Sequence, residues 1–174
     1  AYDGRNASGM DTLFGSYVQP YEDRIKMVRA NHESARWLDV GCGHGHLCAK
    51  GQFMMPEVRF DGLDMGAGVE TARARGWLQT AHLGLFPDRA ESLAGTYDVV
   101  SMSHYLEHTV DPRAEISAAY TVLEPGGVLL IEVPDPDSPW IGLLGRFWMP
   151  WFQPQHLHFV SAIQLAALLR EAGF

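Results

Sequence analysis

The feature that most constrains the fold is a glycine-rich turn that directly follows a short apolar run. Residues 35–40 are mostly apolar, and Gly41-Cys42-Gly43-His44-Gly45 comes next, before helix-like residues that extend to Met55. Glycine has no Cβ atom, so a main chain with glycine at alternate positions can turn sharply and approach a ligand closely. The pattern predicts the ligand-binding corner of an α/β fold, and an ordinary strand-to-helix connection is the simpler alternative.

Strand-like and helix-like segments alternate along the remaining chain. Strands are expected at residues 35–40, 58–63, 78–81, 97–103 and 128–133. Helices are expected at residues 21–30, 46–55, 69–75, 112–123 and 161–173. Near-continuous apolar strands separated by helices favour a parallel sheet covered on both faces, and right-handed crossovers then produce a doubly wound α/β fold.

Capping signals mark two of these helices. Asp111-Pro112 has the chemistry of an N-cap followed by a first helical residue, and Ser161-x-x-Gln164 is a capping box. Tyr120 is expected on the inner face of the first of these helices, together with Ile116, Ala119 and Leu123. Residues 124–127, Glu-Pro-Gly-Gly, are expected to form a turn before the last strand.

Length and composition are those of one globular domain over residues 1–174. Residues 1–34 are expected to form an N-terminal arm and helix, and residues 134–160 an aromatic segment. The net charge is −8 with scattered basic residues, which argues against nucleic acid as a partner. Cys42 and Cys48 follow no disulfide or metal-ligand spacing, and neither a signal peptide nor a membrane span is recognisable. A cytoplasmic location is therefore expected.

Two carboxylates accompany the glycine turn. Asp39 lies just before it, and Asp64 closes the second expected strand about 20 residues later. A carboxylate at that position can accept hydrogen bonds from both ribose hydroxyls of an adenosine, whereas a solvated surface residue is the alternative. The turn is G-x-G-x-G, and His46 stands where a nicotinamide-binding fingerprint would have its third glycine.

Three blocks of the sequence resemble class I S-adenosylmethionine-dependent methyltransferases. They are Leu38–Gly45, Tyr97–Val100 followed by Leu106-Glu107-His108, and Leu123–Gly127. The blocks are most similar to the branch that includes ubiquinone- and menaquinone-biosynthesis methyltransferases. The resemblance covers residues 35–134 and, more loosely, residues 156–174.

The resemblance implies a role for each matching residue. The cofactor-binding residues would be Asp39, Gly41, Cys42, Gly43, Gly45, Asp64, Met65, Ser103 and His104. Asp39 would serve the ammonium group of the cofactor, Asp64 the ribose hydroxyls, and Met65 the adenine. Ser103 and His104 would border the methionine moiety and the methyl group. The residue beside the adenine on the third strand is expected near residues 81–83.

A sulfonium methyl is already activated, so the enzyme mainly has to align a nucleophile with the S–CH₃ bond. A general base is needed only when the nucleophile must lose a proton, and the candidates are His104, Tyr105 and His108. Instead of acting as a base, His108 could form local hydrogen bonds that cap the loop. For Glu107, local hydrogen bonding is the favoured interpretation. His156 and His158 could enter the pocket or pack elsewhere. No metal is expected, because the paired histidines lack an evident third ligand.

The proposed reaction is methyl transfer from S-adenosylmethionine to a small-molecule acceptor by in-line displacement. The aromatic residues of segment 134–160 predict a lid over an apolar or aromatic acceptor, or else cover core surface or a partner. A catalytically silent S-adenosylmethionine-binding subunit or sensor and a nicotinamide-dependent reductase are the alternative functions. The sequence leaves the acceptor, the atom methylated and the oligomeric state open.

The chain departs from the family at its end. The resemblance implies a seven-stranded sheet with an antiparallel hairpin at one edge, but this sequence stops at Phe174, after the helix that precedes the sixth strand. The expected fold is therefore a Rossmann-like methyltransferase fold without the last two strands.

Overall fold

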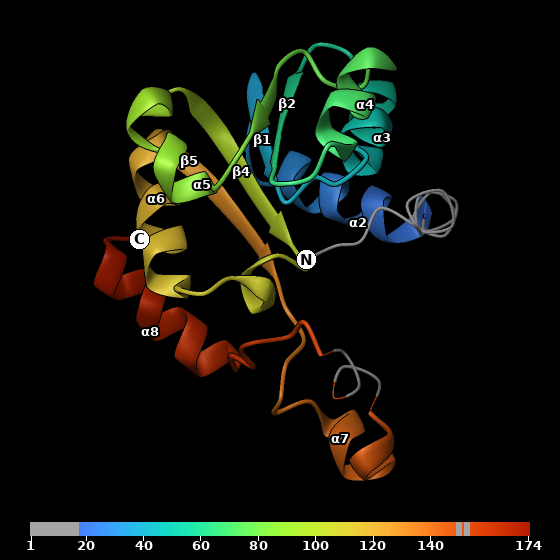
Figure 1. Cartoon of the computed structure of the whole chain (residues 1–174), viewed down its shortest axis with the longest axis vertical. Helices are drawn as coiled ribbons and strands as arrows, with labels where there is room; N and C mark the ends of the chain where they lie inside the picture. Colours follow the sequence, from blue (N-terminus) through green and yellow to red (C-terminus); the bar gives the residue numbers. More distant parts are fainter. Residues whose placement is uncertain (1–17, 149–150, 152–153) are drawn as a thin grey trace.

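The computed structural model describes residues 18–148, 151 and 154–174. Within them, five parallel strands form one sheet in the order β3-β2-β1-β4-β5. The strands are β1 (Arg36–Val40), β2 (Arg59–Asp64), β3 (Ala81–Leu83), β4 (Tyr97–Ser103) and β5 (Leu123–Glu132). The chain runs outward from β1 to β3 and then returns to the other side of β1, which confirms the doubly wound fold (Figure 1).

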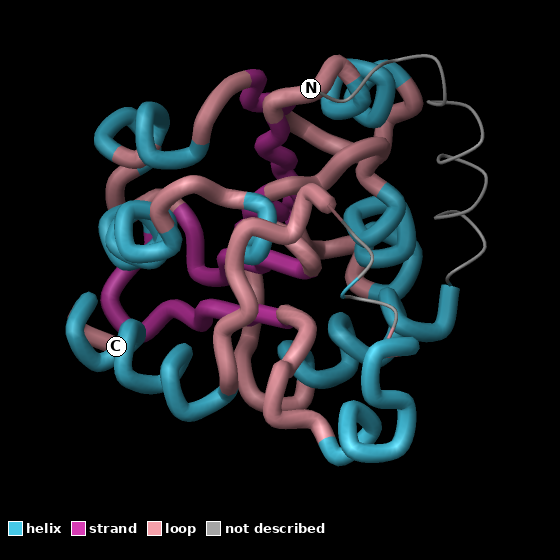
Figure 2. The backbone as a smooth tube through the Cα atoms, turned by 60° about the horizontal axis from the view of Figure 1, so that its bottom comes forward, coloured by secondary structure: helices cyan, strands magenta, loops and turns pink. Residues whose placement is uncertain are grey.

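Helices cover both faces of the sheet, as Figure 2 shows. One face carries α2 (Val18–Arg29), α3 (His46–Met54) and α4 (Gly68–Ala74). The opposite face carries α5 (Phe86–Arg89), η2 (Glu91–Leu93), α6 (Pro112–Val122) and α8 (Ala162–Ala172). Each strand therefore alternates its side chains between two apolar cores, Trp37 facing the first and Leu38 the second.

The two cores are held by the largest buried side chains of the strands. Trp37, Phe60 and Val99 pack under α2, α3 and α4, while Tyr97 and Met102 pack under α5 and α6. At the helix ends, Asp111 accepts hydrogen bonds from the main chain of the first turn of α6, and Ser161 and Gln164 complete the expected capping box of α8. Both capping predictions are confirmed.

Three local expectations were wrong. The third strand spans Ala81–Leu83 rather than residues 78–81, because Leu78 turns into the core and residues after it pair with β2. The expected turn at residues 124–127 lies within β5 as an irregularity in its pairing with β4. Tyr120 is 53% exposed and contacts Phe174 edge-on instead of lining the inner face of α6.

The strand order places a switch point at the carboxyl ends of β1 and β4, where ligands of open α/β sheets bind. The glycine turn, Asp64, η3 (Leu106–His108) and Glu132 all lie at this edge. Beyond β5, α7 (Pro139–Leu144) and η4 (Gly145–Phe147) extend away from the sheet (Figure 1). Residues 1–17 of the expected N-terminal arm and helix lie outside the described residues. No helix in the described part of the chain is both long enough and apolar enough to cross a bilayer.

Candidate functional site

The glycines of the turn are required for different reasons. A Cβ atom at Gly41 would lie 2.5 Å from Cδ2 of Tyr105, and one at Gly45 would lie 2.7 Å from Cβ of Ala72. These two positions are closed to side chains by the protein itself. A Cβ atom at Gly43 would meet no protein atom within 4 Å, although φ is +53° there. Gly43 is therefore the position at which bare main chain faces open space.

Asp64 fixes the turn to the end of β2. Its Oδ2 accepts a hydrogen bond from the main-chain N–H of Gly43 at 2.8 Å, and its Oδ1 accepts one from Gly66 at 2.7 Å. A carboxylate has about four lone-pair directions, so both oxygens can still accept bonds from a ligand. The side chain of Met65, which follows, is 69% exposed at the same edge. Asp64 thus combines an anchoring role with free acceptor capacity.

Cys42 has its side chain on the inner side of the turn. A Cβ atom at Gly62 would lie 2.7 Å from Cys42 Sγ, so the thiol packs against β2. Burial raises the pKa of this thiol, and the nearby carboxylates of Asp39 and Asp64 raise it further. In this arrangement Cys42 offers a ligand its main chain rather than its thiol.

Asp39 is a buried carboxylate beneath the turn. It is 5% exposed, and its Oδ1 accepts a hydrogen bond from Ser101 Oγ at 2.6 Å. Burial raises the pKa of Asp39 to about 6, while the bond from Ser101 and the charge of Arg24 oppose that increase. Arg24 comes from α2 and is itself 8% exposed. Sequence inspection missed Arg24, whose only signal was an arginine on a helix that otherwise packs on the sheet.

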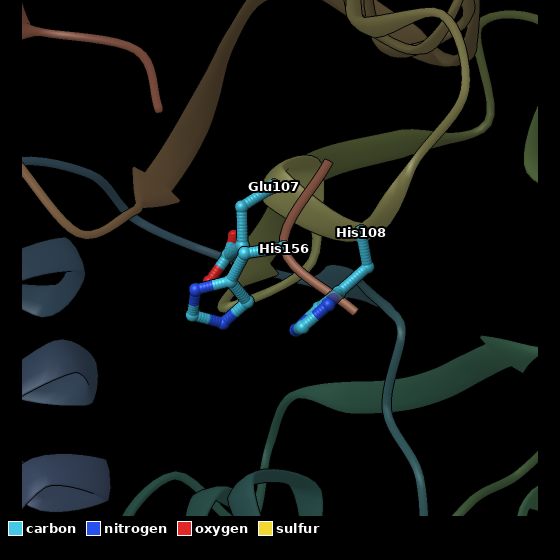
Figure 3. Close-up of side chains that lie close together, drawn as sticks. All are labelled: Glu107, His108 and His156. Carbon is cyan, nitrogen blue, oxygen red and sulfur yellow. The ribbon is translucent and has the colours of Figure 1, made fainter. Parts of the chain in front are cut away.

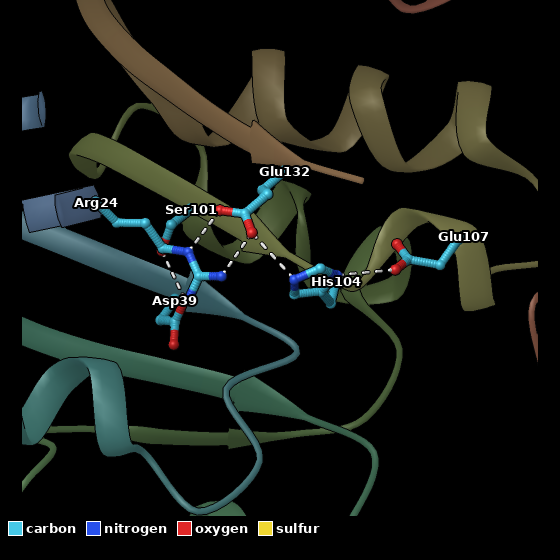
Figure 4. A network of polar contacts seen from close by, with 6 residues as sticks. All are labelled: Arg24, Asp39, Ser101, His104, Glu107 and Glu132. Carbon is cyan, nitrogen blue, oxygen red and sulfur yellow. Dashed lines mark hydrogen bonds and ion pairs between the residues drawn. The ribbon is translucent and has the colours of Figure 1, made fainter. Parts of the chain in front are cut away.

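A chain of charged groups links Arg24 to η3 (Figure 4). The guanidinium of Arg24 donates to both carboxylate oxygens of Glu132 at 2.7 Å, and Glu132 Oε1 lies 3.0 Å from Nε2 of His104. Nδ1 of His104 lies 3.4 Å from Oε1 of Glu107. Glu107 and Glu132 together raise the pKa of His104 to about 9. His104 is therefore an imidazolium at neutral pH, which argues against a role as general base.

The main chain at His104 is strained. Its φ is +51°, and no other non-glycine residue in the described part of the chain has a positive φ. Such a conformation costs of order 1–3 kcal/mol and is found where the surroundings enforce it. The ion pairs with Glu107 and Glu132, together with the bond from His104 N to Glu132 O, provide that enforcement. Next to it, Oγ of Ser103 is buried without a hydrogen-bond partner among the described residues.

Tyr105 lies under the turn with its hydroxyl directed away from it. The ring packs against Gly41, and the hydroxyl donates to Oε2 of Glu115 on α6 at 3.0 Å. Burial and the charge of Glu115 both raise the pKa of Tyr105. The hydroxyl is thus directed at a carboxylate of the core, and the ring forms the floor of the glycine turn.

Glu115 itself makes the stability of this region depend on pH. Burial raises its pKa to about 7, above the ordinary carboxyl value, so the folded state binds the proton more tightly than the unfolded state. Its contribution to stability is therefore complete at low pH and is lost as the pH rises through about 7. Glu115→Gln should raise the melting temperature at pH about 8 by about 2–4 °C, the shift expected for 1 kcal/mol in a chain of this size. Thermal unfolding of both proteins at pH about 4, below the ordinary carboxyl pKa, where the difference should nearly vanish, provides the control; an equal shift at both pH values would contradict this linkage.

Glu107, His108 and His156 form a cluster beside η3 (Figure 3). One ligand atom from each lies within 4.8 Å of the others. His156 is brought there by its neighbour Leu157, whose N–H donates to the main-chain oxygen of Glu107 at 2.7 Å. Glu107 is 1% exposed, and neither carboxylate oxygen has a hydrogen bond in the described residues. The contact of Glu107 with His104, three residues earlier, is local, and the loop cap expected for Glu107 stays a prediction.

The orientation of the His108 ring follows from its partner. Nδ1 of His108 lies 3.1 Å from the main-chain oxygen of Gln155, and a carbonyl oxygen only accepts hydrogen bonds. Nδ1 of His108 must therefore carry a proton, which leaves Nε2 as the basic nitrogen of the neutral ring. The sequence argument against a metal was the lack of a third ligand, and the structure brings Glu107 and His156 to His108. A carboxylate and two imidazoles could hold a divalent cation such as zinc.

The second histidine of the His156-x-His158 pair is turned elsewhere. Nε2 of His158 lies 3.4 Å from the main-chain oxygen of Val110 and does not join the cluster. His156 instead begins a series of aromatic contacts. Its ring lies 4.8 Å from that of His108 and 5.7 Å from that of Phe159, which contacts Trp151 at 4.7 Å and Trp148 at 6.0 Å. The aromatic segment thus contacts residues at the carboxyl edge of the sheet. Phe152 lies outside the described residues.

Comparison with known proteins establishes the family. The model of a methyltransferase domain matches residues 15–174. The chain belongs to the methyltransferase domain family. A ubiquinone biosynthesis O-methyltransferase of Xanthomonas axonopodis pv. citri is 31% identical over 163 residues, which cover 86% of this chain and 67% of the relative. The corresponding protein of Saccharophagus degradans is 29% identical, with 83% and 65% covered. This methyltransferase domain therefore spans about two thirds of the length of these relatives.

Solved structures agree with the fold. An O-methyltransferase family protein from Burkholderia thailandensis has a TM-score of 0.77 at 22% identity, covering 99% of this chain and 55% of the other. A possible histamine N-methyltransferase from Thermotoga maritima has a TM-score of 0.70 at 21% identity, covering 98% and 78%. Together with the family match, these findings confirm the resemblance and the fold class, and they support S-adenosylmethionine as the cofactor of this methyltransferase domain.

Proposed function

We propose that this chain carries out S-adenosylmethionine-dependent O-methylation of a small apolar or aromatic molecule. The observation that carries the proposal is Gly43, whose bare main chain faces open space between Asp39 and Asp64. The two relatives from Xanthomonas and Saccharophagus are ubiquinone biosynthesis O-methyltransferases, which supports a hydroxyl acceptor and an active enzyme rather than a silent binding subunit.

The residues around Gly43 fit the parts of the cofactor. Asp39 and Arg24 are an anion and a cation at the carboxyl end of β1, and they suit the ammonium and the carboxylate of the methionine moiety. Asp64 keeps acceptor capacity for two ribose hydroxyls, and exposed Met65 suits one face of an adenine. Main-chain groups of Gly41, Cys42 and Gly45 and the side chains of Ser103 and His104 complete the proposed site.

His108 is proposed as the general base. The bound cofactor supplies an electrophilic methyl on a sulfonium, and a hydroxyl acceptor loses its proton as its oxygen attacks in line. Nε2 of His108 is free to take that proton because Nδ1 is committed to Gln155. His104 remains protonated and contributes positive charge beside the transfer site. Tyr105 was the second candidate, but its hydroxyl donates to Glu115, so we assign its ring to the floor of the turn.

The aromatic segment is proposed as a wall of the acceptor pocket. The rings of Trp151 and Phe159 continue from His156 and His108, so an apolar acceptor lying against them would be next to the proposed base. Trp140, Leu143 and Phe147 of α7 and η4 are more than 60% exposed, so this part of the segment has apolar surface for closing over an acceptor.

Asp64→Ala is the direct test of the cofactor site. Loss of hydrogen bonds to a charged acceptor should weaken S-adenosylhomocysteine binding by about 1.5–3 kcal/mol, or on the order of tenfold to a hundredfold in dissociation constant. Isothermal titration calorimetry measures this, with Asp64→Asn expected between the wild type and the alanine variant. An unchanged dissociation constant in Asp64→Ala would remove this residue from the site, and tighter binding of NAD than of S-adenosylhomocysteine by the wild type would overturn the proposed function.

The free thiols of Cys42 and Cys48 support a reducing, cytoplasmic environment as part of the proposal.

A further inference from the structure

A buried polar chain runs behind Asp39, on the side opposite to the glycine turn. Trp37 and Asp39 lie two residues apart on β1, and Ser101 lies beside Asp39 on β4. Nε1 of Trp37 lies 2.8 Å from Ser101 Oγ, which in turn lies 2.6 Å from Asp39 Oδ1. Trp37 and Ser101 are fully buried. Figure 4 shows Ser101 and Asp39 next to Arg24.

The indole of Trp37 determines the direction of these hydrogen bonds. An indole N–H can only donate a hydrogen bond, so Trp37 occupies a lone pair of Ser101. The hydroxyl hydrogen of Ser101 must then point to Oδ1 of Asp39, and an ionised Asp39 accepts hydrogen bonds and donates none. Within the described residues, the other oxygen of Asp39, Oδ2, accepts only from the weak thiol donor of Cys48, at 3.9 Å. These two hydrogen bonds form a relay from Trp37 through Ser101 to Asp39. The relay holds Oδ1 of Asp39 and leaves Oδ2 available to a ligand.

We propose that Trp37 and Ser101 are positioning residues that orient Asp39 as a carboxylate toward the ammonium group of the cofactor. The inference rests on the proposed function, because it takes Asp39 as the partner of that ammonium. Neither residue touches the cofactor in this arrangement, since both are buried behind Asp39. An apolar side chain at position 101 would be enough to fill the core. The hydroxyl of Ser101 instead connects the indole N–H of Trp37 to the carboxylate of Asp39.

The relay opposes the effect of burial on Asp39. Burial raises the pKa of Asp39 to about 6, and the bond from Ser101 is the largest contribution that lowers it. The other groups facing Asp39 are Arg24 and Tyr21 from α2, Cys48 from α3, Cys42 from the turn and Asp64 from β2. Ammonium binding needs the carboxylate, so affinity should fall as the pH falls through about 6. Without Ser101 the pKa of Asp39 should be higher, and this loss should begin at a higher pH.

Two ligands separate this role from a general effect on the fold. S-adenosylhomocysteine carries the amino-acid group, whereas 5′-methylthioadenosine keeps the adenosine and the sulfur but lacks that group. Ser101→Ala should weaken S-adenosylhomocysteine binding about tenfold. Binding of 5′-methylthioadenosine should change less than about twofold, because its contacts lie on the Asp64 side. Ser101→Thr keeps a hydroxyl and should restore most of the affinity.

Calorimetric titrations with both ligands, between about pH 5 and 8, complete the test. The pH below which S-adenosylhomocysteine affinity declines should move upward in Ser101→Ala. Equal weakening of both ligands, or no weakening of either, would overturn the relay while leaving the proposed function intact. A wild type that binds neither ligand would instead overturn the proposed function. If Ser101→Ala does not fold, Trp37→Phe, which frees the Ser101 hydroxyl to rotate, should weaken S-adenosylhomocysteine selectively, and equal weakening of the two ligands there would overturn the proposal.

Discussion

Replacing Gly43 by valine is expected to abolish S-adenosylhomocysteine binding while the protein remains folded. The Cβ atom of the new side chain would meet no protein atom within 4 Å. It would instead fill the space in which the cofactor is proposed to lie against the main chain. The dissociation constant should rise by at least about a hundredfold, which corresponds to about 2.8 kcal/mol. Calorimetry on the purified variant measures it, after thermal unfolding has confirmed the fold.

Gly95→Val is the matched control for Gly43→Val. Gly95 has a similar positive φ of +57° and equally open surroundings, but it precedes β4 and so lies at the opposite edge of the sheet. In both variants the valine must adopt a left-handed main-chain conformation. This lowers the stability of the fold by roughly 1–2 kcal/mol for a residue with a Cβ atom. Only Gly43→Val should lose the ligand. Near-normal binding by Gly43→Val would refute the close approach of the cofactor to this turn.

His108→Gln is expected to reduce kcat by about a hundredfold to ten-thousandfold, the usual contribution of a general base. Cofactor affinity should stay within about twofold of the wild type, because, among the described residues, the contacts of the His108 ring are with Gln155 and His156 and not with the glycine turn. The measurement is formation of S-adenosylhomocysteine with a phenolic acceptor found by screening. Direct calorimetry of cofactor binding separates the two effects.

His158→Gln is the control for His108→Gln, because His158 is directed at the main-chain oxygen of Val110 and lies outside the cluster. It should leave kcat nearly unchanged. The role of a base also predicts that activity survives treatment with EDTA. Activity that is lost on chelation and restored by a divalent cation would instead identify Glu107, His108 and His156 as a metal centre.

Much of the proposed cofactor site was proposed from the sequence because its signals are local. Gly43 and Asp64 belong to short motifs that have meaning only at the end of a strand, and the strands before them are short apolar runs. The N-cap roles of Asp111 and Ser161 could be predicted for the same reason, since a cap contacts main-chain groups two or three residues away. The contacts of Arg24 and Ser101 could not be predicted from the sequence. Their partners, Glu132 and Asp39, lie 108 and 62 residues away in the sequence.

By itself, the sequence determined the doubly wound α/β fold, the methyltransferase family and the residues that surround the turn, because periodicity, capping and motif spacing act over a few residues. Only the tertiary structure decided the chemical state of the side chains. His104 is protonated because Glu132 of β5 joins the nearby Glu107 at its ring, and Tyr105 donates to Glu115 because α6 packs behind the turn. His156 reaches His108 because the main chain of Leu157 binds that of Glu107. Protonation and orientation depend on neighbours in space, and those neighbours are known only once the chain is folded.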